Sequence, residues 1–132
     1  MLRVLLFPAF FFCAAASVHA QPDCGRARTN AEMTACAWQK YERIDAALNK
    51  VYQSALKVIA DSGGEPPFDA RRWEALMRKT QRAWIAFRDA ECKELTRAEF
   101  GGGSGTGLAV AECMSALTEA RIEALRERYV ER

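Results

Sequence analysis

The chain has 132 residues, of which 50% are hydrophobic and 27% are charged, and its formal net charge at pH 7 is +2. This charge is too balanced to indicate nucleic-acid binding or adhesion to a membrane. The length fits one small domain behind a short leader. After that leader, no apolar run is long enough to span a bilayer.

Residues 1–20 have the pattern of a secretory signal peptide. Arg3 supplies the positive charge, residues 4–18 are almost entirely apolar, and acceptable residues occupy the −3 and −1 positions before Gln21. We therefore expect cleavage before Gln21, a single mature domain of residues 21–132, and a periplasmic or secreted location. The alternative is an uncleaved membrane anchor.

The mature domain keeps four cysteines, which are Cys24, Cys36, Cys92 and Cys113. An even number in an exported chain indicates two disulfides. Three pairings are open, and we favour Cys24–Cys36 with Cys92–Cys113 because each closes a local loop around a predicted helix end. A metal site is the alternative. The spacings lack C-x-x-C and the only histidine leaves with the signal peptide, so we expect neither metal nor cofactor.

The first predicted helix covers residues 30–60. Thr29 and Glu32 have the spacing of a capping box, which marks a helix N-terminus. Apolar side chains then recur at alternating spacings of three and four, as in an amphipathic helix: Tyr41, Ile44, Leu48, Val51, Ala55 and Val58. Residues 61–67, rich in glycine and proline, end the helix.

The second predicted helix begins after Asp69, a plausible N-cap, and extends to about residue 98. Its expected apolar stripe consists of Trp73, Leu76, Thr80, Ala83 and Phe87, widened by Met77 and Trp84. At this spacing we expect Trp73, Trp84 and Phe87 to belong to the core. An exposed patch for a partner is the less favoured alternative.

A third helix is predicted over residues 108–129, where the apolar stripe comprises Met114, Leu117, Thr118, Ile122, Leu125 and Tyr129. No segment alternates with a period of two, so we expect no sheet. The predicted fold is therefore all-α, a small three-helix or four-helix bundle pinned by two disulfides.

Residues 101–107 separate the second and third helices and form our candidate partner-binding loop: Gly101, Gly102, Gly103, Ser104, Gly105, Thr106 and Gly107. A phosphate-binding loop would need a Lys-Ser/Thr ending and a preceding strand, and both are missing. A simple flexible connection is the alternative. A disulfide between Cys92 and Cys113 would hold both flanks and lower the entropy lost on binding.

Catalytic chemistry is poorly supplied, since the mature domain has no histidine to serve as a general base. Asp89 with Glu91 or Glu94 is the only acid/base pair we considered, and these are typical surface charges. We expect Arg88 to form an ion pair with a carboxylate on another helix, for example Asp45. Trp38 lies off the stripe of the first helix, so we expect it to be an exposed aromatic anchor.

Two motifs taken together suggest a family. The first half reads Cys24-x4-Thr29-x2-Glu32-Met33-x2-Cys36-Ala37-x3-Tyr41-x3-Asp45, and the second reads Gln81-Arg82-Ala83-Trp84-Ile85-x-Phe87-Arg88-Asp89-Ala90-Glu91-Cys92. A glycine loop and Cys113 follow. This pattern resembles the LprI-type lysozyme inhibitor family over nearly all of the mature domain. Trp84, Arg88 and Asp89 are its structural motif here.

The resemblance implies an exported helical protein without catalytic activity that binds and inhibits lysozyme and so protects peptidoglycan. The partner is then a protein, and residues 101–107 would plug the enzyme's carboxylate-lined cleft. The near-zero net charge gives no strong attraction to a basic lysozyme. Alternatives are a periplasmic interaction module in envelope stress response or secretion, and a peptidoglycan hydrolase. The oligomeric state is left open.

Overall fold

The computed structural model describes residues 23–131, so the predicted signal peptide and its cleavage site lie outside the described residues. The helical elements are α1 (Asn30–Ala60), α2 (Ala70–Asp89), a π-helical segment η1 (Ala90–Leu95), α3 (Thr96–Glu99) and α4 (Thr106–Tyr129). No strand occurs in residues 23–131. The all-α prediction is therefore confirmed for the part of the chain that the structure describes.

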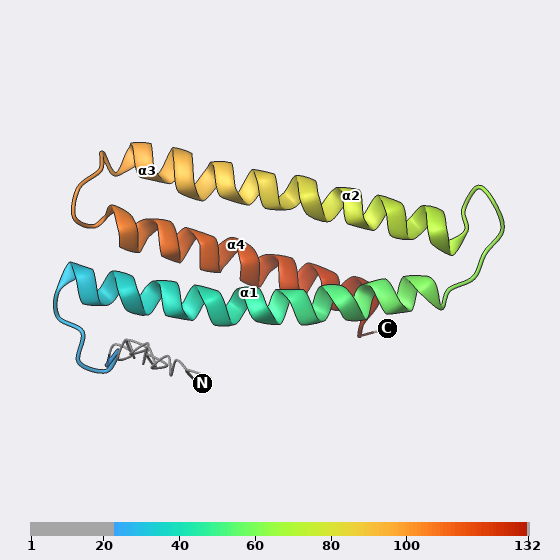
Figure 1. Cartoon of the computed structure of the whole chain (residues 1–132), viewed down its shortest axis with the longest axis horizontal. Coiled ribbons are helices and arrows are strands. Elements are labelled where there is room, and N and C mark those ends of the chain that lie inside the picture. The colour runs from blue at the N-terminus through green and yellow to red at the C-terminus, as the bar shows by residue number, and fades with distance from the viewer. Residues whose placement is uncertain (1–22, 132) are drawn as a thin grey trace, which may run out of the picture.

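Because α2, η1 and α3 follow one another without a break, they form one rod, and the molecule is an elongated bundle of three rods (Figure 1). α1 and α4 run in the same direction and α2 runs against them. One end of the bundle carries the α3–α4 connection and the start of α1. The other end carries the α1–α2 connection and the C-terminus of α4 (Figure 1).

The predicted capping box at the start of α1 is present. The Glu32 amide donates to the Thr29 hydroxyl at 3.2 Å, and the Thr29 amide donates to the Glu32 carboxylate at 3.0 Å. The Arg28 amide also donates to this carboxylate, and these backbone hydrogen bonds lower the pKa of Glu32. The cap therefore satisfies amide groups that a helix start leaves without intrahelical partners.

α1 and α4 share the most extensive interface of the bundle. Their contact and the inner face of α2 bury one apolar cluster: Leu48, Ala55, Leu56, Ile59, Met77, Ile122, Leu125 and Tyr129. The stripe predicted for the third helix is confirmed from Met114 to Tyr129. Val58, which we placed on the stripe of α1, is instead 45% exposed, because the buried face turns toward Ile59.

The prediction for α2 was correct for Met77 and Trp84 and wrong for the rest of the stripe. Trp73 is 39% exposed, Leu76 48% and Phe87 54%. The buried side chains of α2 are Met77, Gln81 and Arg88, and half-buried Trp84 packs against the core. The spacing of apolar residues identifies a stripe on a helix, but it does not show which neighbouring helix the stripe contacts. The helix is rotated so that Arg88 points inward to acceptors on α1 and α4, which leaves much of the apolar stripe in solvent.

Both predicted disulfides are present. Cys24 and Cys36 tie the segment before α1 to that helix, with a Cα–Cα distance of 5.6 Å. Cys92 in η1 and Cys113 in α4 join two rods, with a Cα–Cα distance of 5.5 Å. The predicted second helix is interrupted where Cys92 lies, because residues 90–95 form a π-helical segment rather than continuing the α-helix.

Candidate protein-binding site

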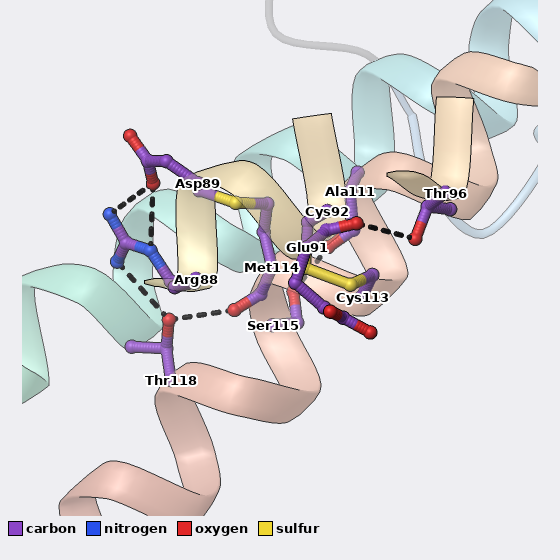
Figure 2. The surroundings of a disulfide bond; sticks show 10 residues. All are labelled: Arg88, Asp89, Glu91, Cys92, Thr96, Ala111, Cys113, Met114, Ser115 and Thr118. Carbon is purple, nitrogen blue, oxygen red and sulfur yellow. Dashed lines mark hydrogen bonds and ion pairs between the residues drawn. A yellow bond between two sulfur atoms is a disulfide. The ribbon is translucent and has the colours of Figure 1, made fainter. Parts of the chain in front are cut away.

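A buried arginine lies at the centre of the family motif. The Arg88 side chain is 7% exposed and donates to the Asp45 carboxylate of α1 at 3.0 Å, as predicted. It also forms an ion pair with Asp89 at 3.1 Å and donates to the Thr118 hydroxyl of α4 at 3.4 Å. Figure 2 shows the contacts with Asp89 and Thr118. One guanidinium therefore connects all three rods.

Two aromatic rings flank this guanidinium. The Arg88 Cζ lies 5.5 Å from the ring centroid of Tyr41 and 5.2 Å from that of Trp84. The Tyr41 hydroxyl donates to Asp45 at 3.3 Å. Burial, more than any neighbouring charge, raises the pKa of Tyr41 to about 12. The cluster is closed by internal partners and acts as a tie between helices, so a binding surface must be sought elsewhere.

The π-helical segment connects this tie to the loop beyond it. The Thr96 amide donates to the Glu91 carbonyl, five residues earlier, which is the spacing of a π-helix. The Thr96 hydroxyl donates to the same carbonyl at 3.1 Å (Figure 2). Cys92 inside this segment is fully buried. Its bond to Cys113 holds the two rods together near the point where the chain turns from α3 into α4.

The turn itself is exposed and poor in side chains. Gly101 and Gly102 have φ angles of 59° and 72°, which disfavour other residues, and a Cβ added at either would meet no described atom within 4 Å. We call residues 101–104 the loop tip. The side-chain amide of Asn30 donates to the Ser104 hydroxyl at 2.9 Å, so the loop tip is also bound to the start of α1.

Two members of the predicted loop lie in α4 rather than in the loop. α4 begins at Thr106, two residues earlier than expected, and Thr106 is only 5% exposed. A Cβ added at Gly107 would lie 2.9 Å from the Thr34 methyl of α1, so this glycine permits close helix contact. The loop therefore ends at residue 105, with Thr106 buried and Gly107 half-buried at the start of α4. Partner contact by the predicted residues stays a prediction.

Trp38 also differs from the prediction. It is half-buried and packs edge-to-face on Tyr41, with ring centroids 5.5 Å apart. Both rings contact a small apolar cluster of Cys92, Val110 and Met114. The ring is placed off the main stripe of α1 because this second cluster, centred on the disulfide, lies there. Trp38 is therefore half-buried against this cluster rather than fully exposed.

The segments before and after the loop tip are rich in acidic residues. Residues 90–112 carry Glu91, Glu94, Glu99 and Glu112 against the two basic residues Lys93 and Arg97. Lys93 is paired with Asp89 at 2.8 Å, whereas the four glutamates form no salt bridge within residues 23–131. In contrast, α2 carries six basic and two acidic residues. The near-zero net charge therefore hides an uneven distribution, which counting charges by segment would have revealed.

Asp89, the carboxylate common to both acid/base pairs suggested by the sequence, is engaged in ion pairs with Arg88 and Lys93. Partial burial raises the pKa of Asp89, but hydrogen bonds from Lys93 and Arg88 outweigh it, so the pKa lies below its usual value. Asp89 therefore stays ionised as an ion-pair partner and is unsuited to donating a proton. Among residues 23–131 no cluster of side chains could hold a metal ion. In the same range, no helix has the length and apolarity to cross a membrane.

The sequence is similar to two bacterial proteins. A protein of Rhizobium meliloti (strain 1021), named uncharacterized protein R02472, is 36% identical over 125 residues, covering 90% of this chain and 89% of its own. Uncharacterized protein YecT of Escherichia coli (strain K12) is 41% identical over 61 residues, covering 44% of this chain and 36% of its own. No solved structure matches.

The profile of one protein family matches residues 22–125, which is most of the chain. That family is described as lysozyme inhibitor LprI. The match includes both disulfides, the Arg88 tie and the loop tip. The chain therefore belongs to the LprI lysozyme inhibitor family.

Proposed function

We propose that this protein is exported and inhibits a basic lysozyme by inserting its loop tip into the enzyme's cleft. The observation that carries the proposal is a small, exposed loop held by a buried disulfide on one side and by Asn30 on the other. Because these restraints already limit the loop's freedom, binding costs less conformational entropy. The loop tip consists of Gly101, Gly102, Gly103 and Ser104, which are narrow enough for a saccharide cleft.

The charges around the loop tip support the same partner. A lysozyme cleft contains two carboxylates, so an uncharged plug is better suited to enter it than an acidic one. The glutamates at positions 91, 94, 99 and 112 would then face the basic rim outside the cleft. Complementary charge of this kind raises the association rate and favours the correct orientation. Inhibition by blockage needs no catalytic group on this chain.

The first test is a titration of the purified protein against basic and neutral lysozymes, with lysis of peptidoglycan as the readout. Stoichiometric inhibition of the basic enzymes is expected. Unchanged lysis at micromolar excess of the protein would refute the proposal. Affinity capture that recovers only secretion or stress-response proteins would instead support an interaction module of that kind.

The variant Gly103→Tyr tests whether the loop tip enters the lysozyme cleft. The added ring should weaken inhibition by at least about tenfold, which corresponds to about 1.4 kcal/mol. Glu65→Tyr adds the same side chain to the exposed connection at the other end of the bundle and serves as the control. Equal inhibition by both variants would show that the loop tip does not enter the cleft.

A charge-reversal pair tests the role of the glutamates at positions 91, 94, 99 and 112. Glu94→Lys with Glu99→Lys should slow association by about tenfold at low salt and by less at high salt, because salt screens exposed charges. Glu65→Lys with Glu131→Lys makes the same net change far from the loop tip. Association rates that fall equally for the two pairs would indicate an effect of net charge only.

A further inference from the structure

Much of the apolar stripe of α2 is left exposed by the bundle, although the Trp73 ring lies 6.0 Å from the ring of Tyr129 on α4. Phe68, just before α2, is 85% exposed, and Trp73, Leu76 and Phe87 are between 39% and 54% exposed. Over residues 73–87 the stripe extends for about 20 Å along the helix. Exposed apolar surface of this extent generally marks an interaction site.

Basic side chains lie on the same face as this stripe. Arg72 and Lys79 are one helical turn before and after Leu76, so the three side chains share one side of α2. Neither Arg72 nor Lys79 forms a salt bridge within residues 23–131. Phe68, Trp73, Leu76 and Phe87, together with Arg72 and Lys79, are called the α2 face.

A groove continues the α2 face toward α4. It has a volume of about 570 Å³, and Trp73, Leu76 and Tyr129 supply its apolar walls. Arg121 and Arg128 lie on its α4 side, together with one acidic residue, Glu127. The Arg128 guanidinium stacks on Tyr129 at 5.4 Å from the ring centroid. The apolar surface therefore has cations along both of its long edges.

The charges on the α2 face indicate which kind of partner can bind there. A second copy of the chain would bring two basic faces together, which repel each other. A basic lysozyme is disfavoured for the same reason. An anionic bilayer fits, because its headgroups attract arginine and lysine while its interface accepts aromatic and aliphatic side chains. The stripe also lies along the length of the bundle, so α2 can rest flat on a surface.

We infer that the α2 face docks the protein on anionic phospholipid surfaces, independently of any lysozyme target. Phe68, Trp73 and Leu76 enter the interface, and Arg72 and Lys79 contact the lipid phosphates. The docked molecule is peripheral, held by one face, and releases at high salt because its charges are screened.

Sedimentation with vesicles tests this inference. The purified protein should bind phosphatidylglycerol-containing vesicles at low salt, release at high salt, and bind phosphatidylcholine vesicles at least about tenfold more weakly. No binding to phosphatidylglycerol vesicles at low salt overturns the inference.

Two pairs of variants map the contact. Arg72→Glu with Lys79→Glu should lower partitioning by about tenfold or more, whereas Lys40→Glu with Arg43→Glu, which lie in a groove between α1 and α4, should change it by about twofold at most. Phe68→Ser with Leu76→Ser should also lower it by about tenfold, with Leu95→Ser and Phe100→Ser, where the native side chains are 49% and 55% exposed, as controls. Equal losses in control and test variants overturn the assignment.

Sizing of the protein without vesicles distinguishes lipid from self-association. A monomer at all concentrations is expected. A concentration-dependent dimer that Phe68→Ser with Leu76→Ser abolishes would overturn the inference, because a second copy would then cover the α2 face. Circular dichroism of each variant confirms that the helices are retained.

Discussion

Arg88 is the residue on which the three rods depend most directly. Its guanidinium reaches Asp45 on α1, Asp89 on its own rod and Thr118 on α4, between the rings of Tyr41 and Trp84. A buried charge without its partners is costly, whereas a fully bonded one is nearly neutral. The contribution of Arg88 to stability therefore depends on all of these contacts being made together.

Replacing Arg88 by alanine should lower the free energy of unfolding by about 3 kcal/mol, since Asp45 would lose its partner and a gap would form between the two rings. This is the lower end of the range for buried pairs because the Asp45 side chain is 37% exposed. Urea unfolding with the disulfides intact measures the change. Arg82→Ala, an exposed arginine on the same helix, should cost less than about 0.5 kcal/mol. Similar costs at both positions would contradict the role of Arg88 as a tie.

Tyr41 gives the cluster a pH dependence at the alkaline end. Its pKa is raised to about 12, chiefly by burial, against about 10 for an unfolded chain. The folded state thus keeps the proton that the unfolded state loses, so this contribution to stability is complete below about pH 10 and is lost between 10 and 12. When the tyrosinate absorbance of Tyr41→Phe is subtracted from that of the wild type, the difference should rise with pH with a midpoint near pH 12. A midpoint near 10 would show that the hydroxyl is not buried.

Among the elements, α2 shows how tertiary contact overrides local pattern, whereas α4 keeps the pattern that its sequence predicts. α2 has a regular apolar stripe, yet it buries Gln81 and Arg88 and exposes Phe87. α4 follows its predicted stripe because α1 covers it along most of its length. The π-helical segment between α2 and α3 contains buried Cys92, which is bonded to Cys113. No spacing rule in the sequence predicts this π-helical segment.

The close contact between α1 and α4 should depend on Gly107. A glycine inside a helix normally costs about 1 kcal/mol relative to alanine, so Gly107→Ala would ordinarily stabilise the protein. Here its Cβ would lie 2.9 Å from the Thr34 methyl, so we expect a loss of about 1 kcal/mol instead. Adding Thr34→Ala should restore stability, as thermal unfolding would show. Gly103→Ala, where the nearest atom is 3.7 Å away, serves as the control. If the effects of Gly107→Ala and Thr34→Ala on stability are additive, the clash between these two positions is excluded.

For the molecule as a whole, the uneven charge separates two proposed functions. The acidic loop end is proposed to meet a basic enzyme, and the basic α2 face is proposed to meet an anionic bilayer. These surfaces lie on different parts of an elongated bundle, so both could be occupied at once. A protein docked in this way would stand where a lysozyme that has crossed the wall reaches the membrane.

The residues that sequence reasoning placed correctly carry local signals. Thr29 and Glu32 marked the start of α1 because a cap depends on neighbours three residues apart. The cysteine pairing followed from loops that close locally, at separations of 12 and 21 residues. Arg88 was matched with Asp45 because a buried charge needs a counter-charge. Trp38, Thr106 and Phe87 were misjudged, since their burial depends on which helix lies opposite.

The sequence by itself determined the helices, their caps, the disulfides and the family, because each depends on local spacing or on a recurring pattern of residues. Only the tertiary structure decided the rotation of α2, the burial of Trp38 and the extent of the loop tip. Those features depend on which face of each helix packs into the shared core. In α2 the bonded Arg88 turned inward, and the apolar stripe that spacing assigns to the core remained in solvent.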